Sequence, residues 1–161
     1  MFLAFLFSVL LSVVHAQEPP TASSWIWYPE VVATEGLGQT RYFRTVLHLA
    51  GMPQEAKLRV MADDGFYCKV NGKPAPEPVE VSPKGTVYDL AGSLTTGDNV
   101  IGFIVTNVSG TGGLLVTGRI IDADGSEIRI HSSPDEFVTH KTEEPGWDEP
   151  GFDAANWLPA G

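Results

Sequence analysis

Apolar and polar side chains alternate with a period of two in residues 58–62 and again in residues 66–70. Such alternation is typical of β-strands that bury one face and expose the other. Asp63-Asp64-Gly65 separates the two segments, and Asn71-Gly72 follows the second. Because Asp-Gly and Asn-Gly supply the positive φ that tight turns need, we expect an antiparallel hairpin over about residues 56–73.

Other segments of the chain also have the pattern of strands. In residues 41–49, Phe43 and Leu47 share one face, and Arg44 lies on the other. Further strands are expected at residues 86–90, 100–108, 114–122, 127–130 and 137–141. Four prolines make residues 74–85 an irregular loop. No run of ten or more residues after residue 16 has a helical period, so the sequence predicts an all-β fold, an antiparallel sandwich or barrel.

The N-terminus reads as a secretory signal peptide over residues 1–16. A short apolar run ends in the small residues Val14 and Ala16, and polar residues follow from Gln17. We expect cleavage after Ala16 and a secreted or periplasmic protein. The apolar run is short for a bilayer span, which disfavours a membrane anchor. A polar entry segment over residues 17–23 would then precede one domain over residues 24–161.

Charge and cysteine content narrow the classes of function. The chain has 161 residues, with 10 Lys and Arg against 20 Asp and Glu, a net charge of −10. Nucleic acids and anionic membranes attract basic surfaces, so neither is an expected partner. Neutral glycans, or cations such as Ca²⁺, fit this charge better. Cys68 is the only cysteine, so the domain must rely on packing, and its phase with Phe66 and Val70 predicts a buried side chain.

Three sequence blocks occur in a characteristic order along the chain. They are Ser24-Trp25-Ile26-Trp27 with Tyr42-Phe43-Arg44, then residues 56–73, then Gly146-Trp147 through Phe152-Asp153 to Trp157. This set resembles the galactose-binding-domain-like β-sandwich, an antiparallel jelly roll found beside glycoside hydrolases such as α-L-rhamnosidases and β-galactosidases, and in secreted proteins of planctomycete-type bacteria. The resemblance covers about residues 24–160.

The resemblance implies a non-catalytic module that binds carbohydrate. Some members of the family bind Ca²⁺, either structurally or as a bridge to sugar hydroxyls, so Ca²⁺ is a candidate cofactor. Members are usually appended to a catalytic or electron-transfer domain. An associated hydrolase or another domain is therefore an expected partner, besides a glycan.

The candidate ligand contacts lie mainly around the turn at residues 63–65. Asp63 and Asp64 could ligate Ca²⁺ through oxygen, Tyr67 could stack on a sugar ring, and Asn107 is a further candidate contact. A plainer interpretation stays open, in which the two aspartates only accept backbone hydrogen bonds of the turn. The aromatic residues could likewise serve packing, and we interpret Trp25, Trp147 and Trp157 as core or edge plugs that join the two chain ends.

Catalytic motifs are missing from the sequence. It contains neither Gly-x-Ser-x-Gly nor His-Glu-x-x-His, and His48, His131 and His140 are widely scattered. The sequence therefore predicts a protein that is not an enzyme: a secreted carbohydrate-binding β-sandwich accessory to a glycan-processing protein. The alternative is a structural or protein-interaction sandwich that packs against a neighbouring domain and binds no sugar.

Overall fold

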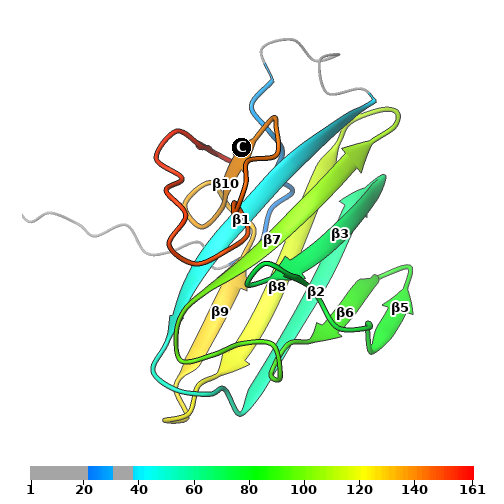
Figure 1. The fold of residues 1–161 in the computed structure, drawn as a ribbon. Helices are drawn as coiled ribbons and strands as arrows, with labels where there is room; N and C mark the ends of the chain where they lie inside the picture. The colour runs from blue at the N-terminus through cyan, green and yellow to red at the C-terminus, as the bar shows by residue number, and fades with distance from the viewer. Residues whose placement is uncertain (1–21, 31–37) are drawn as a thin grey trace, which may run out of the picture.

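Two antiparallel β-sheets face each other in the computed structural model, which describes residues 22–30 and 38–161 (Figure 1). The six-stranded sheet has the order β11-β10-β1-β7-β3-β4, and the five-stranded sheet has the order β5-β6-β2-β8-β9. The strands are β1 (Gln39–Leu49), β2 (Glu55–Asp63), β3 (Gly65–Val70), β4 (Lys73–Pro74), β5 (Glu80–Ser82), β6 (Gly85–Asp89), β7 (Gly97–Asn107), β8 (Gly113–Ile121), β9 (Glu127–His131), β10 (Val138–His140) and β11 (Leu158–Pro159).

The prediction of an all-β sandwich is confirmed. The described residues contain no helix long and apolar enough to cross a membrane. The signal peptide and its cleavage after Ala16 lie outside the described residues, so both stay predictions.

The hydrophobic core fills the space between the two sheets. The six-stranded sheet contributes Phe43 and Phe103, and the five-stranded sheet contributes Leu58 and Leu114, all of them fully buried. Each such side chain contributes about 1.5–3 kcal/mol through burial. Cys68 is buried among these residues, as its phase in the sequence predicted.

Strands β2 and β3 do not form the predicted hairpin. Strand β2 pairs with β6 and β8 in the five-stranded sheet, whereas β3 pairs with β4 and β7 in the other sheet. The chain crosses between the sheets at Asp63-Asp64, where the Asp64 N–H donates to the Thr106 carbonyl of β7 at 3.0 Å. The prediction was wrong because alternation and turn residues mark where strands end, but not which strands they pair with.

The prediction of a tight turn at Asn71-Gly72 is confirmed. Asn71 and Gly72 have φ values of 50° and 78° and join β3 to β4, with Val70 opposite Lys73. The strands expected at residues 114–122 and 127–130 are present as β8 and β9, and they pair as an antiparallel hairpin. The proline-rich loop contains one strand that the sequence did not predict, β5, which extends the five-stranded sheet beyond β6.

The C-terminal segment, residues 142–157, covers the outer face of β1 and β7; we call it the C-terminal cap. Its Trp147 is 1% exposed, and the ring lies 5.4 Å from that of Tyr42. Trp157 stacks on Trp147 at 5.8 Å. Gly102 of β7 lies so close beneath Trp147 that a Cβ there would be 2.8 Å from the ring. Trp147 and Trp157 are therefore packing residues, as predicted.

The cap also explains why Arg44 is buried on the face that alternation assigns to solvent. The Arg44 guanidinium donates to the carbonyl oxygens of Glu149 and Phe152, both at 3.4 Å. Burial lowers the pKa of Arg44. The cation thus fastens the cap to the sheet through backbone acceptors.

Candidate functional site

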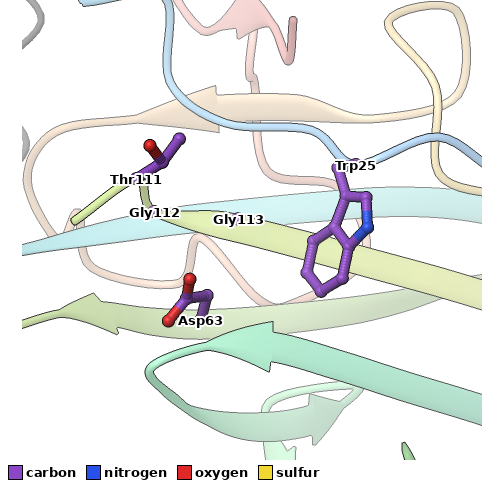
Figure 2. A pocket seen from close by; sticks show the side chains of 5 residues that line it. All are labelled: Trp25, Asp63, Thr111, Gly112 and Gly113. Atoms are coloured by element: carbon purple, nitrogen blue, oxygen red, sulfur yellow. The ribbon is translucent and has the colours of Figure 1, made fainter. Parts of the chain in front are cut away.

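A hollow of about 230 Å³ lies at one end of the five-stranded sheet. Trp25, Asp63, Thr111, Gly112 and Gly113 line it. Figure 2 shows the indole of Trp25 on one side, with the side chains of Asp63 and Thr111 on the other. The lining comes from the N-terminal segment, the end of β2 and the start of β8, so the hollow exists only in the folded chain.

The pairing of β2 with β8 sets the floor of this hollow. Ala62 lies opposite Leu114, whose side chain is fully buried in the core, and Asp63 lies opposite Gly113. Because successive side chains of a strand point to opposite faces, Asp63 lies on the outer face of the sheet. Gly113 adds no side chain there, so bare backbone forms the floor next to the Asp63 carboxylate.

Trp25 forms one wall of the hollow and is held by its neighbour. The Ile26 N–H donates to the Leu114 carbonyl at 2.9 Å, and the Leu114 N–H donates back at 2.9 Å. Ile26 is buried in the core, while Trp25 is 51% exposed. A core position is therefore wrong for Trp25, because the alternation that buries Ile26 turns Trp25 outward, although its indole packs against Gly113.

Gly112, just before β8, and Gly113, its first residue, make room for two tryptophans. A Cβ at Gly113 would lie 2.7 Å from Cε3 of Trp25, and a Cβ at Gly112 would lie 2.6 Å from Cζ2 of Trp27. Real Cβ atoms are not found so close to ring carbons. The two glycines thus allow the N-terminal segment to pack closely against the start of β8.

Asp64 accepts backbone hydrogen bonds near the turn, as the plainer interpretation of the sequence predicted. Its Oδ2 accepts hydrogen bonds from the N–H groups of Val108, at 2.5 Å, and Ser109, at 3.1 Å. These two bonds hold the pKa of the Asp64 carboxyl below its usual value, with a smaller contribution from Asp63. The Asp64 side chain therefore ties the β2–β3 crossing to the loop after β7.

Asn107 ends β7 and is 2% exposed. Its Nδ2 donates to the Gly110 carbonyl at 3.2 Å, but its Oδ1 is buried and accepts no hydrogen bond. Leaving a buried acceptor unsatisfied costs about 1–3 kcal/mol. The position is consequently suited to a group that supplies a positive charge or a donor.

Tyr67 lies apart from this site. It is 74% exposed and sits on β3 opposite Ile104 of β7, and the next residue, Cys68, points into the core. Tyr67 therefore projects from the outer face of the six-stranded sheet. Of the four predicted contacts, the structure gathers Asp63, Asp64 and Asn107 near the same loop and leaves Tyr67 on another surface.

Ca²⁺ takes oxygen ligands from carboxylates, amides and backbone carbonyls, and residues at this end of the sandwich carry such groups. Asp63 and Asp64 supply carboxylates, and Asn107 supplies an amide oxygen without a hydrogen bond. Among the described residues, no group of three or more His, Cys, Asp or Glu could hold a metal ion. The two carboxylates would accordingly need the amide and backbone oxygens to complete a ligand set.

Two further hollows lie elsewhere on the described surface. One of about 420 Å³ lies against the C-terminal cap between Lys69 and Glu149, and one of about 290 Å³ lies between Asn71 and Thr95. No exposed aromatic ring is among the residues that line either of them. The Trp25 hollow alone among the three combines an exposed ring with a carboxylate.

No protein-family model and no curated protein matches the chain. Solved structures do match, each over 86% of this chain. Streptomyces avermitilis α-L-rhamnosidase complexed with L-rhamnose has a TM-score of 0.69 and 27% identity, over 14% of its own chain. The lectin from Pleurotus ostreatus in complex with GalNAc has a TM-score of 0.67 and 22% identity, over 40% of its chain. The α-L-rhamnosidase from Aspergillus terreus has a TM-score of 0.72 and 18% identity, over 21% of its chain.

These likenesses show the fold to be that of a galactose-binding-domain-like β-sandwich, as the sequence blocks implied. The neighbours are a domain within rhamnosidases and a lectin, which associates this architecture with carbohydrate. The chain spans 14–40% of the length of these three proteins.

Proposed function

We propose that this chain is a carbohydrate-binding accessory domain whose ligand occupies the Trp25–Asp63 hollow. The observation that carries the proposal is the exposed indole of Trp25, which lies across the hollow from the side chains of Asp63 and Thr111, with the backbone of Gly112 and Gly113 between them (Figure 2). Sugars present apolar C–H surface and hydroxyl groups on one ring, so they suit a site that combines these features. The two kinds of structural neighbour, a lectin and a domain of rhamnosidases, support the same class of ligand.

Ca²⁺ belongs to this proposal as a cofactor of binding. Asp63, Asp64 and the unsatisfied Oδ1 of Asn107 would hold the ion. When bound, it would offer coordination positions for sugar hydroxyls, which are oxygen ligands like those of the protein. Asp64 would keep its two backbone hydrogen bonds and hold the loop after β7 in place.

The role we propose is delivery rather than chemistry. A domain that only binds sugar needs no nucleophile or general acid, and it would hold an associated hydrolase or another domain close to glycan. Export from the cytoplasm is part of this proposal and rests on the sequence pattern of residues 1–16.

A structural role is the second candidate. Val79 and Val81 are strongly exposed at the edge of the five-stranded sheet, where β5 has no further partner strand among the described residues. An edge strand with apolar side chains can pair with another chain. In that case, Val79→Thr together with Val81→Thr would abolish association with a neighbouring domain and leave sugar binding untouched.

A glycan array of the purified chain, probed with Ca²⁺ and with a chelator, tests the first proposal. We expect binding to a restricted set of glycans that weakens when the metal is removed. Asp63→Asn should weaken it as well, because one carboxylate of the site is lost. Absence of binding to every glycan in both conditions would contradict the proposal and favour the structural role.

A further inference from the structure

We infer that the site recognises one neutral sugar ring at a chain terminus, with Trp25 as the surface on which the ring stacks. The inference rests on the proposed function and names its ligand class and its main aromatic contact. The sequence favoured Tyr67 as that contact. Substitutions at Trp25 and at Tyr67 therefore distinguish the two possible stacking surfaces.

The backbone holds Trp25 in place on both sides. The residues on either side are fixed by backbone hydrogen bonds, from Ser24 N–H to the Ser132 carbonyl and from Ile26 N–H to the Leu114 carbonyl, both at 2.9 Å. The indole rests against Gly113, which leaves no room for even a methyl group. A wall that is already ordered loses little conformational entropy when a ligand binds.

The polar side chains of the hollow lie on the side away from Trp25. Asp63 and Thr111 lie across the hollow from the indole (Figure 2). A carboxylate accepts hydrogen bonds, and a hydroxyl both donates and accepts. A sugar ring that lies with its C–H face on Trp25 would therefore direct hydroxyl groups toward Asp63 and Thr111.

The volume of the hollow limits the size of its ligand. Pockets for drug-sized ligands have volumes of about 300–1,000 Å³. The hollow of about 230 Å³ falls below that range and has walls on two sides. It suits a single ring, with the rest of a glycan left in solvent, better than it suits several consecutive rings.

The charge of the lining residues limits the charge of the ligand. None of the described residues that line the hollow is Lys, Arg or His, so no side chain there could pair with a carboxylate or a sulfate. The whole chain carries a net charge of −10, which also disfavours anionic ligands. A neutral sugar is thus preferred over a uronic acid or a sulfated sugar.

Titration calorimetry with Ca²⁺ present tests the inference, with methyl α-L-rhamnoside, methyl β-N-acetylgalactosaminide and methyl α-D-galacturonide as probes. Disaccharides that end in the neutral sugar that binds form a fourth class of probe. We expect at least one neutral probe to bind, its disaccharide to bind within about threefold of the same affinity, and the uronide to bind more weakly.

Variants of the two aromatic residues separate the possible contacts. Trp25→Ala should weaken binding by about tenfold, Trp25→Phe by less, and Tyr67→Ala by no more than about twofold. Thermal melting of each variant without sugar checks the fold, and Trp25→Phe keeps the test valid if Trp25→Ala is unstable.

The outcomes distinguish this inference from the proposed function. If the glycan array and every probe show no binding to the unaltered chain, the proposed function fails. If sugar binds and Tyr67→Ala loses affinity while Trp25→Phe and Trp25→Ala do not, the stacking surface is wrong although the function stands. Tighter binding of the uronide, or of a disaccharide by more than about tenfold, overturns the ligand class.

Discussion

The two adjacent aspartates at the sheet crossing show how neighbouring residues of one type acquire different tasks. Asp64 accepts two backbone hydrogen bonds and stabilises the loop after β7, while Asp63 faces the hollow. The sequence left ligand binding and turn hydrogen bonding open for both residues, because the choice depends on which side chain points at the Val108 and Ser109 amides. Whether Tyr67 contacts a ligand stays a prediction. The sequence could not show that it lies away from the hollow that Trp25 lines, because strand phase reports which way a side chain points but not what lies on that face.

Asp64 gives a prediction for stability as a function of pH. Its pKa in the folded chain lies below the unfolded value because of the two backbone donors. The stabilisation is therefore present above the unfolded pKa and is lost as the pH falls through the lower, folded pKa. Asp64→Asn should lower the melting temperature at pH 7, and the difference from the unaltered chain should shrink as the pH falls below the unfolded pKa.

Asp63→Asn is the matched control for that experiment. Its side chain lines the hollow, and no backbone hydrogen bond ties it to the loop after β7 in the described structure. This variant should melt close to the unaltered chain when Ca²⁺ and sugar are both absent. A loss as large as that of Asp64→Asn would contradict the division of tasks.

Cys68 gives a second prediction at this scale. Burial raises the pKa of its thiol to about 12, so the thiol stays protonated at ordinary pH. Because the thiolate is the reactive form, a thiol reagent at pH 8 should label native protein very slowly and urea-unfolded protein rapidly. Rapid labelling of the native protein would show that β3 opens or that Cys68 is accessible.

Among the elements, the C-terminal cap is the one that the sequence specified least. It contains no regular strand between β10 and β11, so periodicity could predict its tryptophans as packing residues but not the surface that they cover. That surface is the face of β1 and β7 where Arg44 and Gly102 lie. Alternation alone assigns Arg44 to solvent, because it cannot include a segment about one hundred residues later in the chain.

Gly102 provides a direct test of this packing. A methyl group there would meet the Trp147 ring at 2.8 Å, so Gly102→Ala should lower the free energy of unfolding by about 1–3 kcal/mol. Gly92 has open space around its Cβ position, and Gly92→Ala should change stability by no more than about 0.5 kcal/mol. Urea denaturation of both variants is the measurement, and equal stabilities would show that the cap does not press on β7.

At the scale of the whole molecule, the sequence predicted the architecture, whereas the role of Asp63, Asp64 and Asn107 as ligand contacts stays a prediction. The sequence could not predict the hollow, whose walls come from three segments separated by up to about ninety residues. Trp25 reaches Gly113 only because Ile26 pairs with Leu114. Such a contact depends on the folded topology and leaves no local pattern.

Metal binding would act on the stability of the entire domain. A ligand that binds only the folded state raises stability by mass action. Millimolar Ca²⁺ should therefore raise the melting temperature of the unaltered chain, and Asp63→Asn or Asn107→Ala should abolish the increase. Mg²⁺ at the same concentration controls for ionic strength, and an unchanged melting temperature in Ca²⁺ would remove the metal from the proposed function.

The crossing at Asp63-Asp64 has one more consequence. Strand β2 belongs to one sheet, while Asn107 ends β7 in the other. An ion or sugar that contacts residues of both sheets would cross-link the two sheets at this end of the sandwich. Under a pulling force that shears the layers, as when glycan anchors one part and an enzyme drags another, the occupied domain would resist sliding more than the empty one.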